Sequence, residues 1–115
     1  MRYALLIFVN PDSYDGLTED ERNALTAEYM TIADDPRVAG GAHLRPIETA
    51  TTLRGNGDGF LTTDGPFADT KEVFGGWFLL DAADIDEAME VAARIPAMRG
   101  GGAVEVRPVV MESGR

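Results

Sequence analysis

The sequence predicts an α+β protein, a ferredoxin-like sandwich with an inserted β-hairpin. Two continuously apolar runs of strand length lie at residues 3–9 and 76–81, and each precedes a segment whose apolar residues recur with a helical period. Glycine-rich turns separate shorter strands from them. The order strand, helix, strands, strand, helix, strand corresponds to two βαβ-like halves. Because 115 residues bury enough surface for one core and not two, residues 1–115 are expected to form a single domain.

The first half opens with the strand at residues 3–9, which Asn10 and Pro11 end. A capping box predicts that a helix begins after Thr18, because the Thr18 hydroxyl can accept the Glu21 amide while the Glu21 side chain reaches back. The buried stripe of this helix is formed by Leu25, Tyr29, Ile32 and Ala33. Pro36 and the glycine pair at 40–41 predict where it ends.

The middle of the chain is predicted to hold short strands and tight turns. Residues 42–47 and 49–54 are expected to be strands, with Pro46 near the break between them. The glycines of residues 54–60 predict a turn, from which residues 60–63 return as a strand. A second tight turn follows before the apolar strand at 76–81.

The second helix is predicted to begin after Asp84, which together with Glu87 resembles a capping box. We expect Ile85, Ala88, Met89 and Ala92 to form its buried stripe. Pro96 ends the helix, glycines 100–102 turn the chain, and the alternation at 104–107 predicts a last, half-exposed strand.

The apolar strands predict a homodimer. Two helices can cover only one face of the sheet, yet the strands at 3–9 and 77–80 are apolar on both faces. A second copy of the chain is the simplest cover for the remaining face. We therefore expect two sheets to pack face to face.

Composition excludes several classes of function. The net charge of −10, with a pI near 4.3, disfavours nucleic acids and anionic membranes as partners. No apolar run approaches the roughly 18 residues that span a bilayer, and residues 1–9 lack a signal-peptide cleavage site, so a cytoplasmic protein is expected. Without cysteine and with a single histidine, no zinc site of the usual kind is predicted, and no metal or redox cofactor is expected.

Chemistry-bearing residues concentrate at 64–76, which read DGPFADTKEVFGG. This segment holds three acids and the only lysine between two apolar strands. The Gly65–Pro66 turn can fix the backbone, and Phe67 and Phe74 can supply an apolar wall. The mixed charges suit a small polar or anionic ligand, and the residues expected to line its cleft are Asp64, Gly65, Thr70, Lys71 and Glu72.

Individual residues of this segment allow two interpretations. Asp64 is either a general base or substrate anchor, or a turn residue that accepts local backbone N–H groups. Lys71 either binds an anion or forms a Schiff base, or is a surface lysine paired with Glu72 or Asp69.

His43 and Arg45 form a second candidate pair. Two residues apart on a predicted strand, they share one face. They either line an anion-binding cleft, with His43 as acid or base, or form an edge-strand pair that faces solvent.

The segment DGPFADTKE resembles the signature DGPFAETKE of the DGPF-type members of the YCII-related family, which a glycine pair and an aromatic residue follow. Asp69 stands where that signature has glutamate. Residues 49–54 and 99–108 also resemble family segments, so the similarity extends over nearly the whole chain.

The resemblance implies a ferredoxin-like fold and a dimeric α+β barrel. Most members have no assigned reaction. Some YCII-type relatives are thought to be enzymes with a histidine–aspartate pair in a cleft, which here implies catalytic roles for His43 and Asp64. Other DGPF-type members resemble partners of extracytoplasmic-function sigma factors. Two hypotheses follow, a small-molecule site with acid–base chemistry or a non-catalytic interaction module. An enclosed polar cleft around Asp64 would favour the first, and an open, flat surface the second.

Overall fold

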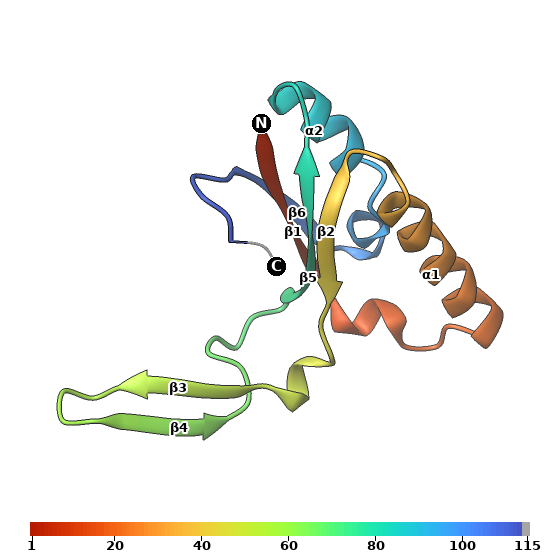
Figure 1. The fold of residues 1–115 in the computed structure, drawn as a ribbon. Helices are drawn as coiled ribbons and strands as arrows, with labels where there is room; N and C mark the ends of the chain where they lie inside the picture. The colour runs from red at the N-terminus through yellow and green to blue at the C-terminus, as the bar shows by residue number, and fades with distance from the viewer. Residues whose placement is uncertain (114–115) are drawn as a thin grey trace.

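A computed structural model describes residues 1–113 as an α+β protein with an antiparallel four-stranded sheet and a separate two-stranded sheet (Figure 1). The strands and helices are β1 (Arg2–Val9), α1 (Glu19–Ala33), β2 (Val38–His43), β3 (Thr51–Gly55), β4 (Phe60–Asp64), β5 (Val73–Asp81), α2 (Ile85–Ala92) and β6 (Ala103–Pro108). Short 3-10 helices lie at η1 (Pro11–Tyr14), η2 (Ile47–Thr49) and η3 (Pro96–Gly100).

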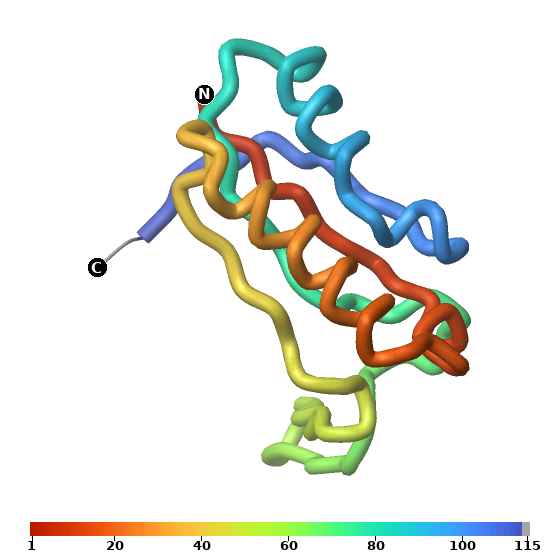
Figure 2. The backbone as a smooth tube through the Cα atoms, turned by 90° about the vertical axis from the view of Figure 1, so that its right-hand side faces the viewer, coloured from red at the N-terminus to blue at the C-terminus, as the bar shows by residue number. Residues whose placement is uncertain are grey.

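The large sheet has the strand order β2-β5-β1-β6. The neighbours β1–β5, β1–β6 and β2–β5 are all antiparallel. Helices α1 and α2 lie side by side on one face of this sheet (Figure 2). The predicted α+β class and the inserted hairpin, formed by β3 and β4, are therefore confirmed. Within residues 1–113 the sheet stays open and closes into no barrel.

The core lies between the large sheet and the helices. Its largest fully buried side chains come from β1, β5, α1, α2 and the residue before η3, namely Leu5, Leu80, Ile32, Val91 and Ile95. Both predicted helix starts are confirmed. The Thr18 hydroxyl accepts the Glu21 amide at 3.1 Å, and the Thr18 amide donates to the Glu21 carboxylate at 3.1 Å. The Asp84 carboxylate accepts the Glu87 amide at 2.9 Å.

The predicted strand at 42–47 is wrong. Strand β2 lies at Val38–His43, and the residues after it form a loop that contains η2. Gly40 and Gly41 do not end α1, which stops at Ala33; they belong to β2 instead. Gly41 has φ +156°, and a Cβ atom there would collide with the Trp77 carbonyl of β5. Gly41 therefore allows the backbones of β2 and β5 to approach closely. A glycine pair in a sequence is more often taken as the sign of a turn, which explains the wrong prediction.

Candidate functional site

The segment that carries the predicted site leaves the large sheet at one end. Because β2 and β5 are antiparallel neighbours, the end of β2 and the start of β5 lie together. The hairpin and residues 65–72 connect these two points in the chain. His43, the last residue of β2, pairs with Gly76, and the Leu44 amide donates to the Gly75 carbonyl at 2.9 Å. The structure therefore places His43 at the same end of the sheet as the return from residues 64–72.

The Asp64–Gly65 turn is tied to the base of the hairpin. Asp64 ends β4 opposite Thr51. The Gly65 amide donates to the Ala50 carbonyl at 2.7 Å, and the Thr52 hydroxyl donates to the Gly65 carbonyl at 2.7 Å. Gly65 has φ +103°, a backbone conformation that is strained for any residue with a Cβ atom. The turn therefore requires glycine at this position.

Phe67 is held by an arginine that sequence reasoning missed. The Arg54 guanidinium lies 4.4 Å from the centroid of the Phe67 ring, and its Nη2 donates to the Phe67 carbonyl at 3.5 Å. The Phe67 ring is otherwise exposed. Phe74, the other expected wall, lies on the large sheet instead. The two phenylalanines therefore belong to different parts of the fold, Phe67 to the loop after β4 and Phe74 to β5.

The remaining predicted residues lie at the surface. Asp64, Thr70, Lys71, His43 and Arg45 are exposed, and Glu72 is half-buried. The Thr70 hydroxyl donates to the Glu72 carbonyl at 2.5 Å. Within residues 1–113 no hydrogen bond joins His43 to Asp64, and no ion pair joins Lys71 to a carboxylate. The functional roles of these residues therefore stay predictions.

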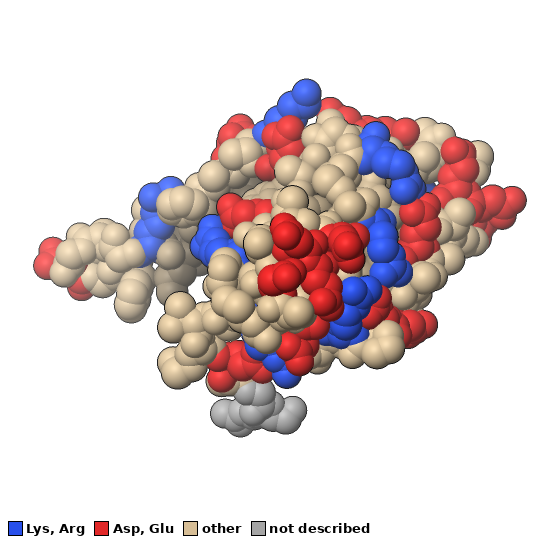
Figure 3. All heavy atoms as spheres, turned by 90° about the horizontal axis from the view of Figure 1, so that it is seen from above, with Lys and Arg blue, Asp and Glu red and all other residues tan. Residues whose placement is uncertain are grey.

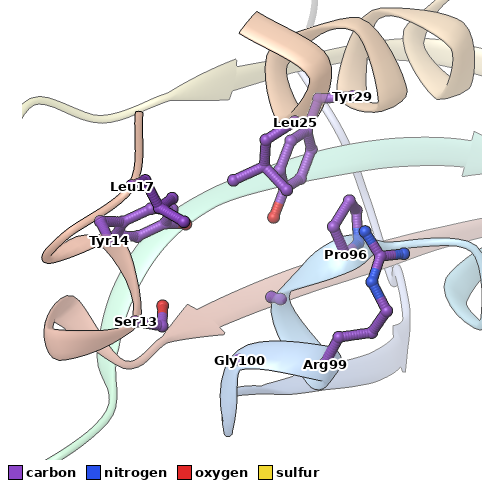
Figure 4. A pocket seen from close by; sticks show the side chains of 9 residues that line it. Ser13, Tyr14, Leu17, Leu25, Tyr29, Pro96, Arg99 and Gly100 are labelled. Carbon is purple, nitrogen blue, oxygen red and sulfur yellow. The ribbon is translucent and has the colours of Figure 1, made fainter. Parts of the chain in front are cut away.

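A cavity of about 180 Å³ lies on the helical side, away from the predicted site (Figure 4). It is lined by Ser13, Tyr14, Leu17, Leu25, Tyr29, Pro96, Ala97, Arg99 and Gly100. Burial raises the pKa of Tyr29 to about 12, with the neighbouring Tyr14 hydroxyl adding to the shift, and burial also raises the pKa of Tyr14. Both phenols therefore stay protonated at neutral pH. The volume is below the roughly 300 Å³ of typical ligand pockets.

Arg99 lines one side of this cavity, but its guanidinium is paired with a carboxylate and is not free to bind an anionic ligand. Its two terminal nitrogens donate to the Glu28 carboxylate at 2.7 and 3.0 Å, and this contact lowers the pKa of Glu28. Sequence reasoning assigned Tyr29 to the buried helix stripe and found no signal at Tyr14. Only the fold brings η1, α1 and η3 together.

The face of the large sheet opposite the helices carries apolar side chains from β1 and β5, and the charged Glu105 and Arg107 of β6 border them. Register pairs Leu6 with Trp77 and Ala4 with Leu79. At one end, the Phe74 ring lies 5.6 Å from the Phe8 centroid and stacks at 6.3 Å on Trp77. We call this surface, formed by Ala4, Leu6, Phe8, Phe74, Trp77 and Leu79, the open face. Trp77 is 36% exposed although it sits mid-strand.

Within residues 1–113, no cluster of three histidine, aspartate or glutamate side chains is placed to hold a metal ion. No helix of this part of the chain has both the length and the apolar character needed to cross a membrane.

Comparison with known proteins gives consistent matches along the chain. A family model described as YCII-related domain matches residues 1–113. A protein of Rhizobium meliloti (strain 1021), described as uncharacterised, is 35% identical over 117 residues, covering 96% of this chain and 94% of the relative. Both matches span the sheet, the helices and the hairpin alike.

Proposed function

The chain belongs to the YCII-related family, and from this premise we propose that it is a homodimer that binds a small polar or anionic molecule beside residues 64–76. The proposal includes the DGPF subtype, which the motif DGPFADTKE supports, and a cytoplasmic location. It also includes the ferredoxin-like sandwich, supported by the strand order β2-β5-β1-β6 with both helices on one face.

The observation that best supports a homodimer is that the single chain exposes more surface than a compact monomer of its mass. The chain exposes 8055 Å², whereas a compact monomer of 12.4 kDa exposes about 6,100 Å². Its radius of gyration of 15.9 Å likewise exceeds the roughly 13 Å of a compact chain of this length. Two chains that each buried the surplus of about 1,900 Å² would hide about 3,800 Å² together, a size found in obligate homodimers. The open face supplies an apolar centre for that interface.

The ligand site is proposed at the end of the sheet where the hairpin departs. The proposed site residues offer two carboxylates and up to three cationic or hydrogen-bonding side chains; they are Asp64, Gly65, Thr70, Lys71, Glu72, His43 and Arg45. Such a set suits a small anion that also carries a hydrogen-bond donor. His43 and Asp64 are the groups proposed for acid–base catalysis, if the bound molecule is turned over without metal or redox cofactor.

A non-catalytic interaction module is the second candidate. The exposure of Asp64, Lys71 and His43 in the single chain favours it, because an open surface suits a protein partner better than a small molecule. An extracytoplasmic-function sigma factor is the partner proposed under this alternative. It predicts complex formation with that factor and no response to small anions.

Light scattering and ligand-induced melting shifts test the proposal. The wild-type chain at micromolar concentration should have about twice the mass of 12.4 kDa. Among small carboxylates and phosphates, at least one should raise the melting temperature, and Lys71→Gln should abolish that rise. Arg22→Gln, an equal loss of positive charge on exposed α1, should retain it. A monomer, or equal shifts in both variants, would contradict the proposed site.

A further inference from the structure

The β3–β4 hairpin stands apart from the rest of the fold. Its two strands pair only with each other, from Thr51–Asp64 to Gly55–Phe60. In Figure 1 the helices lie to the right of the large sheet and the hairpin extends to the left, the side of the open face. Figure 2, which views the helices from the front, shows the hairpin foreshortened at the lower end. An isolated two-stranded hairpin is marginally stable in water, so a contact with a partner would stabilise this one.

Both surfaces of the hairpin carry exposed apolar side chains. Leu53 is 61% and Phe60 is 74% exposed, and their register places them on one surface. Leu61 is 55% exposed and lies on the opposite surface, across from Arg54. Seen from above, the hairpin projects as a largely uncharged arm beside a body dense in charges (Figure 3). Exposed apolar side chains concentrated in this way mark an interaction surface.

The length of the hairpin and its low charge favour a second copy of the chain as the partner that contacts it. A five-residue strand is about 17 Å long, whereas two packed sheets are about 10 Å apart. A hairpin that projects on the side of the open face is therefore long enough to reach past the sheet of a copy packed there. Each chain carries a net charge of −10, so two copies repel except where charge is low. Residues 51–64 contain only Arg54, Asp58 and Asp64 as charged side chains.

We propose that the β3–β4 hairpin of each protomer packs against a second copy of this chain and buries Phe60 and Leu61 there. This inference rests on the proposed homodimer and extends it from the open face to the hairpin. It also connects dimer formation to the ligand site. The Gly65 turn is hydrogen-bonded to Ala50 and Thr52, and Phe67 is held by Arg54. The second copy, by fixing the hairpin, would fix the backbone beside Asp64.

Serine substitutions at the hairpin test the contact. Phe60→Ser and Leu61→Ser should each raise the dimer dissociation constant about 10-fold to 100-fold, measured by sedimentation on dilution. Met30→Ser is the matched control, because Met30 on α1 is 56% exposed and lies on the helical side. Its dissociation constant should stay within about twofold of wild type. Hairpin variants that dimerise like the wild type would overturn the inference and leave the open-face homodimer intact.

Photocross-linking gives an independent readout without weakening the dimer. The photoreactive residue p-benzoylphenylalanine in place of Phe60 should yield a covalent dimer on irradiation, and the same residue in place of Met30 should not. A dimeric protein that gives no cross-link from position 60 would overturn the hairpin contact alone. A wild-type chain that sediments as a monomer would overturn both this inference and the proposed homodimer.

Discussion

The body of the molecule and its β3–β4 hairpin are stabilised in different ways. In the body, β1 and β5 bury Leu5 and Leu80 completely against α1, α2 and the segment that leads to η3. In the hairpin, Thr52 alone among the strand residues is half-buried, and Leu53, Phe60 and Leu61 stay exposed. The same chain therefore contains one unit that encloses its own core and one that offers apolar surface to a partner. The open face lies between these two cases, because it is formed by the body yet left uncovered by it.

The largest expected effect comes from charging the open face. Leu79→Asp should dissociate the dimer or unfold the chain, because a buried carboxylate without a partner costs several kcal/mol. Light scattering distinguishes dissociation from unfolding when circular dichroism is recorded on the same sample. Met89, which the sequence predicted to be buried, is 53% exposed on α2, so Met89→Asp introduces the same charge at the surface and should leave the mass unchanged. Wild-type behaviour of Leu79→Asp would show that the open face is not an interface.

A core truncation sharpens the contrast between body and hairpin. Leu80→Ala should lower the free energy of unfolding by about 2–5 kcal/mol, because Leu80 is fully buried between the sheet and the helices. Leu53→Ala removes the same atoms from the exposed hairpin and should change the stability of the body by no more than about 0.5 kcal/mol. Hydrogen exchange of the β1 and β5 amides reports on the body alone. Equal losses of amide protection in the two variants would show that the hairpin contributes to the stability of the body as much as its buried core does.

In the body, an element could be predicted from the sequence where the residues that determine it are close neighbours in the chain. The capping residues Thr18 and Asp84 and the apolar strands β1 and β5 carry their signals within a few neighbours, and the structure confirms them. Strand β2 was predicted too late in the chain, at 42–47, because Gly40 and Gly41 look like a turn. Gly41 is instead required by the close approach of its backbone to the Trp77 carbonyl, a contact between residues far apart in the chain.

The sequence allowed the residues of the candidate site to be recognised as a motif, but it did not predict how their side chains are arranged in space. Residues 64–72 stand out by composition, and the turn at Gly65 requires the glycine found there. The stacking of Arg54 on Phe67 depends on the register of the hairpin, which sequence spacing does not specify. The cavity between Tyr14 and Tyr29 depends on three segments that meet only in the fold.

An ion-pair cluster within the body provides a pH-dependent prediction of intermediate size. Asp35 accepts hydrogen bonds from Arg37 Nε at 3.0 Å, Arg37 Nη2 at 2.8 Å and Arg94 Nη1 at 3.0 Å, and only 10% of its side chain is exposed. The Arg37 guanidinium and amide hold the pKa of Asp35 well below its usual range. Asp35→Asn should therefore lower the free energy of unfolding by about 2 kcal/mol at pH 7.

The sign of the pH effect follows from the lowered pKa of Asp35. An unfolded aspartate titrates near pH 3.9, roughly, so the stabilisation is fully present above about pH 5 and is lost as pH falls toward the lower pKa of the folded state. The stability difference between wild type and Asp35→Asn should shrink over that range in urea titrations. Asp34→Asn, at the exposed neighbouring position, should track the wild type. A difference that stayed constant down to pH 2 would show that the pairing with Arg37 does not set the pKa.

The smallest expected effect on stability is at Asp64, where hairpin and candidate site meet. Its exposed side chain accepts no hydrogen bond within residues 1–113, so Asp64→Asn should melt near wild type, within about 0.5 kcal/mol. If Asp64 contacts the ligand, the same variant should lose the ligand-induced melting shift, because the amide keeps the size and removes the charge. Asp58→Asn at the hairpin turn makes an equal charge change away from the site and should keep the shift. A loss of several degrees in melting temperature with unchanged ligand affinity would instead make Asp64 a turn residue, whose role is to hold the hairpin rather than to bind.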